Sequence, residues 1–252
     1  MMYNKQNIFF YLSLVGLILA FPAATHAEEK HPPLTPFSAQ YHVKKFGLKI
    51  GEMETQLILQ ENDTYLFTSS SRTTGMVSIF REDNVTEKTL LQWLNGKIKP
   101  LDYSFIQTGK KSREISVKFN WQEKIYLKND EGHTTSLPLE PDTLDRMSYQ
   151  LAIMHDLKVN RRPLTYSIVE RKGIIPLDFE ITGEENIELP LGRFKTIVIK
   201  RTHENNKRQT VLWCAQELAY FPVKIMHVEK EGGRFFAELQ KLEGITLKSA
   251  IR

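Results

Sequence analysis

The strongest constraint on the fold is a strict alternation of side chains over residues 114–121. Apolar side chains occupy every second position there: Ile115, Val117, Phe119 and Trp121. The positions between them are polar. Because successive side chains of a strand point to opposite faces, this pattern predicts a strand with one buried and one solvated face, as is typical of antiparallel sheets.

Similar apolar alternation recurs along most of the chain. It predicts further strands over 38–46, 52–60, 65–74, 78–91, 101–107, 124–129, 164–171, 177–182, 194–201, 210–213, 223–229 and 234–242. The connectors are short and carry turn residues, as in Asn95-Gly96 and Glu231-Gly232-Gly233. Short connectors favour hairpins in a meander over crossover connections between parallel strands.

One segment has a helical period instead. Its apolar residues are spaced three or four apart: Leu144, Met147, Leu151 and Met154. Asp142 is placed to cap the helix, and Asp145 falls in its first turn, where a negative charge suits the helix dipole. We therefore expect one central helix over about 142–157, with its apolar stripe against the sheet.

These elements predict a mainly β fold, either a strongly curved antiparallel sheet or a β-barrel-like meander with the one helix. Curvature or closure of the sheet protects its edge strands from pairing with other chains. No linker rich in Gly, Ser or Pro divides the strands, so we expect a single β-rich domain over 37–244. Residues 28–36 form a flexible lead-in and 245–252 a C-terminal tail.

The first 27 residues have the parts of a secretory signal peptide. Lys5 precedes an apolar run over 8–21, and small residues lead to Ala27. The run is shorter than the ~20 residues of a spanning helix, which favours cleavage near Ala27 over an uncleaved anchor. No cysteine lies near that position to carry a lipid, and the one cysteine, Cys214, is expected to be a buried free thiol rather than a catalytic one. The sequence therefore predicts a periplasmic protein with no stable transmembrane anchor.

The charge balance excludes one class of partner. The formal net charge is +4, and removal of 1–27 takes away Lys5 and no acid, which leaves +3. The basic residues are interspersed with acids along the chain. Nucleic-acid binding uses a concentrated basic stripe, so we expect no nucleic-acid partner.

Motifs for known chemistries are missing from the sequence. It has no H-E-x-x-H, G-x-S-x-G, P-loop, G-x-G-x-x-G or C-x-x-C. Asp142 and Asp145 could hold a cation near the helix end, but helix capping is the commoner role for such residues. We therefore expect no metal, no cofactor, no catalytic residue and no enzymatic activity.

Aromatic residues are the best candidates for a binding site. Four lie in or beside strands expected to face the interior: Phe119, Trp121, Trp213 and Phe235. They could line a cavity for an apolar ligand, as in many curved sheets and barrels, or simply fill the core. The pattern on a strand is the same in both cases.

A set of short motifs occurs in a fixed order along the chain. They are Gly51-Glu52, Tyr65, Lys99-Pro100, Tyr103, Phe119-Asn120-Trp121, Leu137-Pro138, Asp142, Asp145, 189–196, Trp213 and 220–224. In this order they resemble the bacterial exported family catalogued as domain of unknown function 3108. The resemblance covers about 37–244. It implies a mainly β fold in the envelope of Gram-negative bacteria, and no catalytic residues to carry over.

Two functional hypotheses follow. The first is a non-enzymatic periplasmic envelope protein whose curved sheet binds an apolar ligand or a protein partner. The second is an envelope hydrolase that uses carboxylates near the central helix, Asp142 and Asp145. The hydrolase requires these two side chains to meet in an open cleft, beside a histidine or a third acid.

Overall fold

A computed structural model describes residues 33–75, 84–109, 112–202 and 208–246. These residues belong to one compact unit, Pro32–Arg252. The expected signal peptide, most of the lead-in and most of the C-terminal tail lie outside the described residues, as does the start of the strand expected over 78–91. No helix among the described residues is long and apolar enough to cross a membrane.

The described chain forms fourteen strands, one α-helix and two short 3-10 helices. In chain order these are β1 (Phe37–Lys45), β2 (Leu48–Leu59), η1 (Glu61–Asp63), β3 (Thr64–Thr73), β4 (Asn84–Leu94), β5 (Lys97–Thr108), β6 (Arg113–Asn120), β7 (Ile125–Asp130), β8 (His133–Pro138), α2 (Ser148–Lys158), β9 (Leu164–Glu170), β10 (Gly173–Leu189), β11 (Gly192–Thr202), β12 (Gln209–Ala215), η2 (Gln216–Leu218), β13 (Phe221–Val228) and β14 (Arg234–Glu243).

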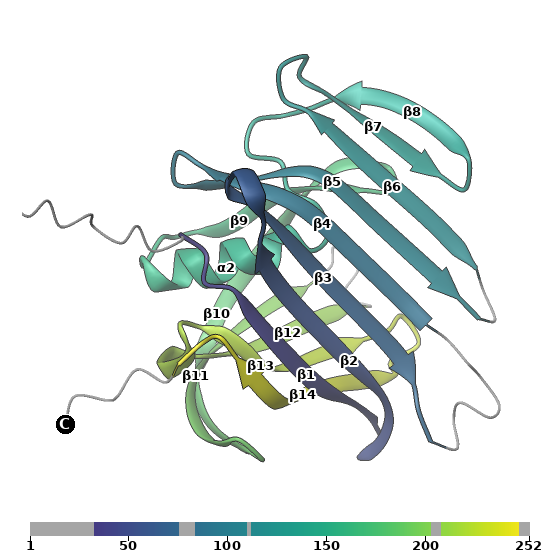
Figure 1. Cartoon of the computed structure of the whole chain (residues 1–252). Helices are drawn as coiled ribbons and strands as arrows, with labels where there is room; N and C mark the ends of the chain where they lie inside the picture. The colour runs from purple at the N-terminus through teal and green to yellow at the C-terminus, as the bar shows by residue number, and fades with distance from the viewer. Residues whose placement is uncertain (1–32, 76–83, 110–111, 203–207, 247–252) are drawn as a thin grey trace, which may run out of the picture. The chain divides into compact units, whose positions relative to one another are not determined.

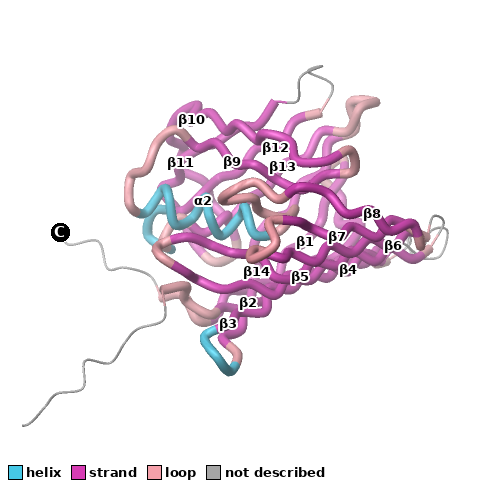
Figure 2. The backbone as a smooth tube through the Cα atoms, turned by 90° about the horizontal axis from the view of Figure 1, so that it is seen from above, coloured by secondary structure: helices cyan, strands magenta, loops and turns pink. Residues whose placement is uncertain are grey.

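All strands belong to one antiparallel sheet, in the order β8-β7-β6-β5-β4-β3-β2-β1-β14-β13-β12-β11-β10-β9. The first and last strands, β1 and β14, are therefore neighbours at its centre. Two meandering arms extend from this pair, and they end in the edge strands β8 and β9 (Figure 1). The sheet is strongly curved but is not closed into a barrel (Figure 2). The predicted curved antiparallel meander is confirmed.

The strands define two ends of the sheet. The chain leaves β8 for α2 and enters β9 at one end, which we call the helix end. The opposite end, which we call the distal end, carries the turns β1–β2, β7–β8, β9–β10 and β13–β14. Alternation places Ile115, Val117 and Phe119 on the inner face of β6, where all three are buried.

The helix lies on the concave side of the sheet, between the two arms (Figure 2). It begins at Ser148, later than the 142–157 span predicted for it. The reason is a contact distant in sequence: Leu144 makes two backbone hydrogen bonds with the edge strand β9, at Ser167 and Val169. This pairing keeps the chain extended before the helix and covers part of the β9 edge.

The apolar stripe expected on the helix is present only in part: Leu151 and Met154 lie on α2, whereas Leu144 and Met147 precede its first residue. Met147 and Leu151 are 1% and 3% exposed and pack in the core formed with the sheet. Cys214 is buried on β12, as predicted, and burial raises the pKa of its thiol to about 12. A thiol with so high a pKa stays protonated and unreactive at neutral pH.

Candidate ligand-binding site

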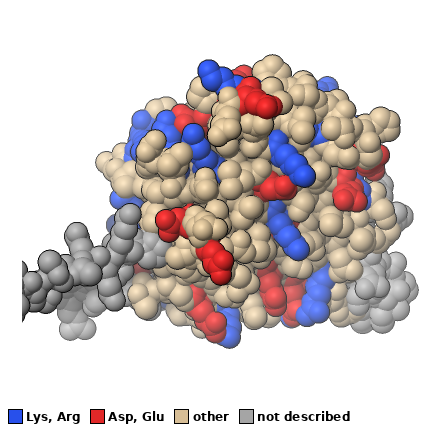
Figure 3. Space-filling view, turned by 45° about the horizontal axis from the view of Figure 1, so that its top comes forward, with Lys and Arg blue, Asp and Glu red and all other residues tan. Residues whose placement is uncertain are grey.

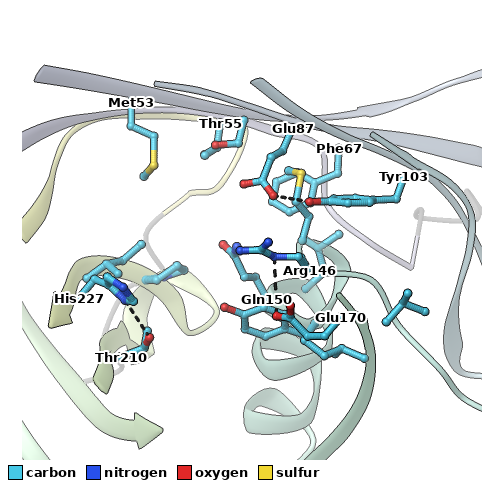
Figure 4. A pocket seen from close by; sticks show the side chains of 18 of the residues that line it. Met53, Thr55, Phe67, Glu87, Tyr103, Arg146, Gln150, Glu170, Thr210 and His227 are labelled. Atoms are coloured by element: carbon cyan, nitrogen blue, oxygen red, sulfur yellow. Dashed lines mark hydrogen bonds and ion pairs between the residues drawn. The ribbon is translucent and has the colours of Figure 1, made fainter. Parts of the chain in front are cut away.

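A cavity of about 630 Å³ lies on the concave side of the sheet. Both arms and the first turns of α2 contribute to its wall. Figure 4 shows Met53 and Thr55 of β2 across from His227 of β13, with Arg146 and Gln150 to one side of them. The cavity therefore depends on the way the sheet brings distant strands around the helix.

The wall toward the helix end is apolar. Phe37 and Phe221 meet edge to face at 5.0 Å between ring centroids, and both are buried. The Tyr41 hydroxyl is already satisfied, since it donates a 2.8 Å hydrogen bond to the carbonyl oxygen of Pro222. With Leu151 of α2, these side chains offer a dry surface to an apolar group.

The charged side chains of the cavity lie toward the distal end, with apolar side chains such as Ile115 and Ile225 among them. The cations are Arg113, Lys128, Arg146, Arg171, Arg201 and Arg208, and the carboxylates are Glu87, Asp130 and Glu170. The surplus is three positive charges. Arg171, Arg208 and His227 are exposed and lie at or just beyond the distal ends of β9, β12 and β13, so the cavity meets solvent there.

Arg146 is the central charged group. Its Nε lies 3.8 Å from Glu170 Oε1, and 41% of its side-chain surface is open, toward the cavity (Figure 4). Burial lowers the pKa of its guanidinium, but Glu170, Tyr103 and Glu87 outweigh burial and raise it. Arg146 thus keeps its charge inside the protein and can receive an anion.

The charge on the β11–β13 side is less well balanced. Burial lowers the pKa of Arg201, and Arg146 lowers it further against the opposing effect of Tyr149 and Glu170. Burial also lowers the pKa of His227, together with Arg208 and Arg201, although Glu229 opposes them. Lowered pKa values at two cationic groups mark a region where an added negative charge would be stabilised.

The four aromatic residues expected to line a cavity lie elsewhere. Phe119 and Trp121 come together near the helix end, with ring centroids 6.0 Å apart, and the Trp121 indole donates a 2.7 Å hydrogen bond to the Pro100 carbonyl. They fill the core, the alternative left open by their pattern.

Trp213 and Phe235 lie apart from that pair. Thr210 faces the cavity, so alternation along β12 puts Trp213 on the convex face, where its indole donates a 2.8 Å hydrogen bond to Glu185. Phe235 is on the concave face near the distal end, opposite His227 in the β13–β14 register. None of the four lines the cavity described above.

Asp142 and Asp145 have separate roles. Asp142 is exposed and forms a 2.5 Å ion pair with Lys97. Asp145 is fully buried, and its Oδ1 accepts hydrogen bonds from the backbone N–H groups of Met147 (2.7 Å) and Ser148 (2.9 Å) at the start of α2. The two carboxylates do not meet in a cleft, so the geometry required by the hydrolase hypothesis is not formed. The expected capping of the helix falls to Asp145 rather than Asp142.

A second cavity, of about 490 Å³, lies on the other side of α2, near the helix end. Two of its lining residues, Trp93 and His155, pack ring against ring with their centroids 4.6 Å apart. Asp156 is already engaged by Arg161 at 3.0 Å and by the Tyr166 hydroxyl at 3.1 Å. Among the described residues, no group of three or more His, Cys, Asp or Glu side chains is arranged to hold a metal ion.

Comparison with known proteins identifies a family and a fold. The family model described as "Protein of unknown function (DUF3108)" matches residues 37–240. The solved structure of a beta-barrel-like protein of domain of unknown function DUF1849 from Brucella abortus matches 86% of this chain and 99% of that chain, with a TM-score of 0.54 and 8% identity. That likeness shows a shared fold.

A structure of MucB in complex with MucA(peri) matches 86% of this chain and 94% of that chain, at 6% identity. Its TM-score of 0.16 is too low to support any structural argument. No curated protein matches the sequence.

Proposed function

The chain belongs to the family of unknown function DUF3108, and we propose that it is a non-enzymatic binding protein of the cell envelope whose cavity holds an amphipathic ligand with an anionic group. The observation that carries the proposal is the division of the cavity wall into an apolar part and a part with a surplus of three positive charges. The envelope location rests on the signal peptide expected over 1–27.

The size of the cavity is suited to a small molecule. Its volume of about 630 Å³ falls within the range of roughly 300–1,000 Å³ that is usual for ligand sites. A ligand of this size is favoured over a protein partner because the wall curves around an enclosed volume between the arms and α2. The dry wall at Phe37 and Phe221 suits an acyl chain or another apolar group.

The charged side chains of the cavity narrow the class of ligand, from the apolar molecule expected from the sequence to one that also carries a negative charge. A purely apolar molecule would desolvate Arg146 and Arg201 without giving them a partner, which is costly. A carboxylate, phosphate or sulfate at the distal end of the cavity would accept hydrogen bonds from these guanidinium groups. An amphipathic anion therefore satisfies both halves of the wall.

Binding is favoured over hydrolysis by the same residues. The carboxylate Glu87 accepts a hydrogen bond from Tyr103, and Glu170 is paired with Arg146. Both acids are engaged with neighbours, and Asp145 caps the helix. Arg146 is shared with Glu170, and Arg113 pairs with Asp130 at 3.2 Å. Arg201 and Arg208 have no ion-pair partner among the described residues, so they are the cations left to meet a ligand.

Native mass spectrometry of the mature protein purified from its own envelope, with organic extraction, tests the proposal. We expect a bound molecule of amphipathic, anionic character that is depleted in the double variant Arg201→Gln/Arg208→Gln. The matched control is Arg72→Gln/Arg193→Gln, which removes two exposed charges outside the cavity wall. A protein that carries no molecule, or equal depletion in both variants, would overturn the proposal.

A further inference from the structure

The tip of the β1–β2 hairpin exposes two large apolar side chains side by side. Phe46 is 87% exposed and Leu48 is 70% exposed, the highest values among the large hydrophobic residues that the structure describes. Isolated exposed apolar residues are common on protein surfaces. Two at the tip of one hairpin instead form an apolar tip that is exposed to solvent. Core packing does not account for them.

Turn chemistry does not account for Phe46 either. The loop between Lys45 and Leu48 has two residues, and both have positive φ: 51° at Phe46 and 77° at Gly47. The β4–β5 hairpin makes the same kind of loop with Asn95 (φ 53°) and Gly96 (φ 76°). Asparagine is favoured at such a position, whereas a bulky residue there is strained. The hairpin thus carries a phenylalanine at a local cost in stability.

Lysines surround the tip. Lys44 pairs with Glu238 at 2.6 Å, and Lys49 pairs with Glu52 at 2.7 Å. Lys45 has no ion-pair partner among the described residues, and its Nζ lies 5.7 Å from the centroid of the Phe46 ring. An exposed apolar tip beside an ammonium group that forms no ion pair among the described residues is complementary to the surface of a bilayer with anionic lipids. Apolar side chains enter such a surface, and lysines stay at the head groups.

The tip is joined to the cavity by direct contacts. The same Lys45 Nζ lies 4.3 Å from the centroid of the Phe235 ring. Phe235 is opposite His227 in the β13–β14 register, and His227 lines the cavity. Phe46, Lys45 and Phe235 therefore lead from the hairpin tip to the distal opening of the cavity.

We propose that the β1–β2 tip, through Phe46 and Leu48 with Lys45, docks on an anionic lipid bilayer. Docking in this way presents the distal opening of the cavity to the lipid surface. The contact with the bilayer does not require a ligand in the cavity, so this inference and the proposed function can fail separately.

Flotation with vesicles tests the docking. The mature protein is mixed with vesicles of 3:1 palmitoyl-oleoyl phosphatidylethanolamine and phosphatidylglycerol, or with phosphatidylcholine alone. The test variant is Phe46→Asn/Leu48→Thr, which replaces the strained phenylalanine with a residue suited to the turn. The matched control is Leu94→Ser/Leu191→Ser, which removes two apolar residues that are 44% and 42% exposed near turns at the helix end.

We expect the wild type to float with the anionic vesicles. Binding to phosphatidylcholine vesicles should be weaker, and so should binding to the anionic vesicles at high salt concentration. The Phe46→Asn/Leu48→Thr variant should lose at least tenfold in partitioning, with an unchanged or higher melting temperature and unchanged binding of an anionic probe in the cavity. The Leu94→Ser/Leu191→Ser control should float as the wild type does. The proposal is overturned if the wild type stays unbound, if both variants lose binding equally, or if Phe46 instead mediates a dimer in solution.

Discussion

The hydroxyl of Tyr103 on β5 donates a 2.6 Å hydrogen bond to Glu87 on β4, inside the cavity. Burial raises the pKa of both groups; Glu87 raises that of Tyr103 further, whereas Tyr103 and Arg146 oppose the rise at Glu87. Tyr103 therefore stays protonated at every physiological pH. Glu87 takes up a proton at a higher pH than an ordinary glutamate.

This pair predicts a pH dependence of anion binding. As the pH falls, protonation of Glu87 removes a negative charge that faces Arg146, Asp145 and Glu170. His227, whose pKa is lowered, gains its positive charge at a lower pH than an ordinary histidine. Affinity for 8-anilinonaphthalene-1-sulfonate, which stays charged throughout, should rise from pH 8 to pH 5.

The variant Glu87→Gln isolates the effect. The amide still accepts the Tyr103 hydrogen bond, so we expect tighter binding of the sulfonate at pH 7.5 and a flatter pH profile. Because the pKa of Glu87 is raised on folding, its contribution to stability is present at low pH and lost as the pH rises through that pKa. The free energy of unfolding of Glu87→Gln should therefore fall less than that of the wild type as the pH rises through the pKa of Glu87. An unchanged binding profile would contradict the assignment of Glu87 to the cavity wall.

Asp145 is predicted to act through the start of α2. Its Oδ1 also accepts a 3.0 Å hydrogen bond from Thr89, which ties the helix to β4. Asp145→Ala should lower the free energy of unfolding by about 2 kcal/mol, since it removes the cap and strands buried N–H groups. Asp145→Asn keeps an acceptor and should lose less than half as much. Urea unfolding measures both; equal losses would contradict the capping role.

Gly51 is predicted to be required by close packing of β2 on β3. A Cβ at this position would lie 2.5 Å from the backbone carbonyl oxygen of Arg72. Gly51→Ala must shift one strand against the other and should cost about 2 kcal/mol of unfolding free energy. The control is Gly132→Ala. A Cβ at Gly132 would meet open space, so this substitution tests only the cost of the positive φ at that position. Thermal unfolding should rank Gly51→Ala as the less stable of the two.

The sequence predicts the sheet better than the helix start. Alternation correctly predicts that Ile115 and Val117 share the buried face of β6, because burial of one face of a strand imposes a period of two. The helical period predicts a start near Asp142, but Asp142 has a positive φ of 59° and Leu144 pairs with β9. Pairing with a distant strand leaves no local signal in the chain.

The candidate site was missed for a similar reason. Glu87, Arg146 and Arg201 lie far apart in sequence, and each resembles a charged residue of a solvated face. The curvature of the sheet turns those faces inward around α2. Phe235 lies on the concave face and Trp213 on the convex face. Alternation predicts which residues of one strand share a face, but it does not say which face of the sheet is concave.

The central claim is that the cavity recognises an apolar body and an anionic head together. The most direct measurement compares binding isotherms of 11-(dansylamino)undecanoic acid and 11-(dansylamino)undecanol with the mature protein at pH 7.5 and one salt concentration. We predict saturable binding of both, with the carboxylate at least tenfold tighter, a difference of about 1.4 kcal/mol, and loss of that preference in Arg201→Gln/Arg208→Gln. Equal affinity for acid and alcohol, or no saturable binding of either, would contradict the account.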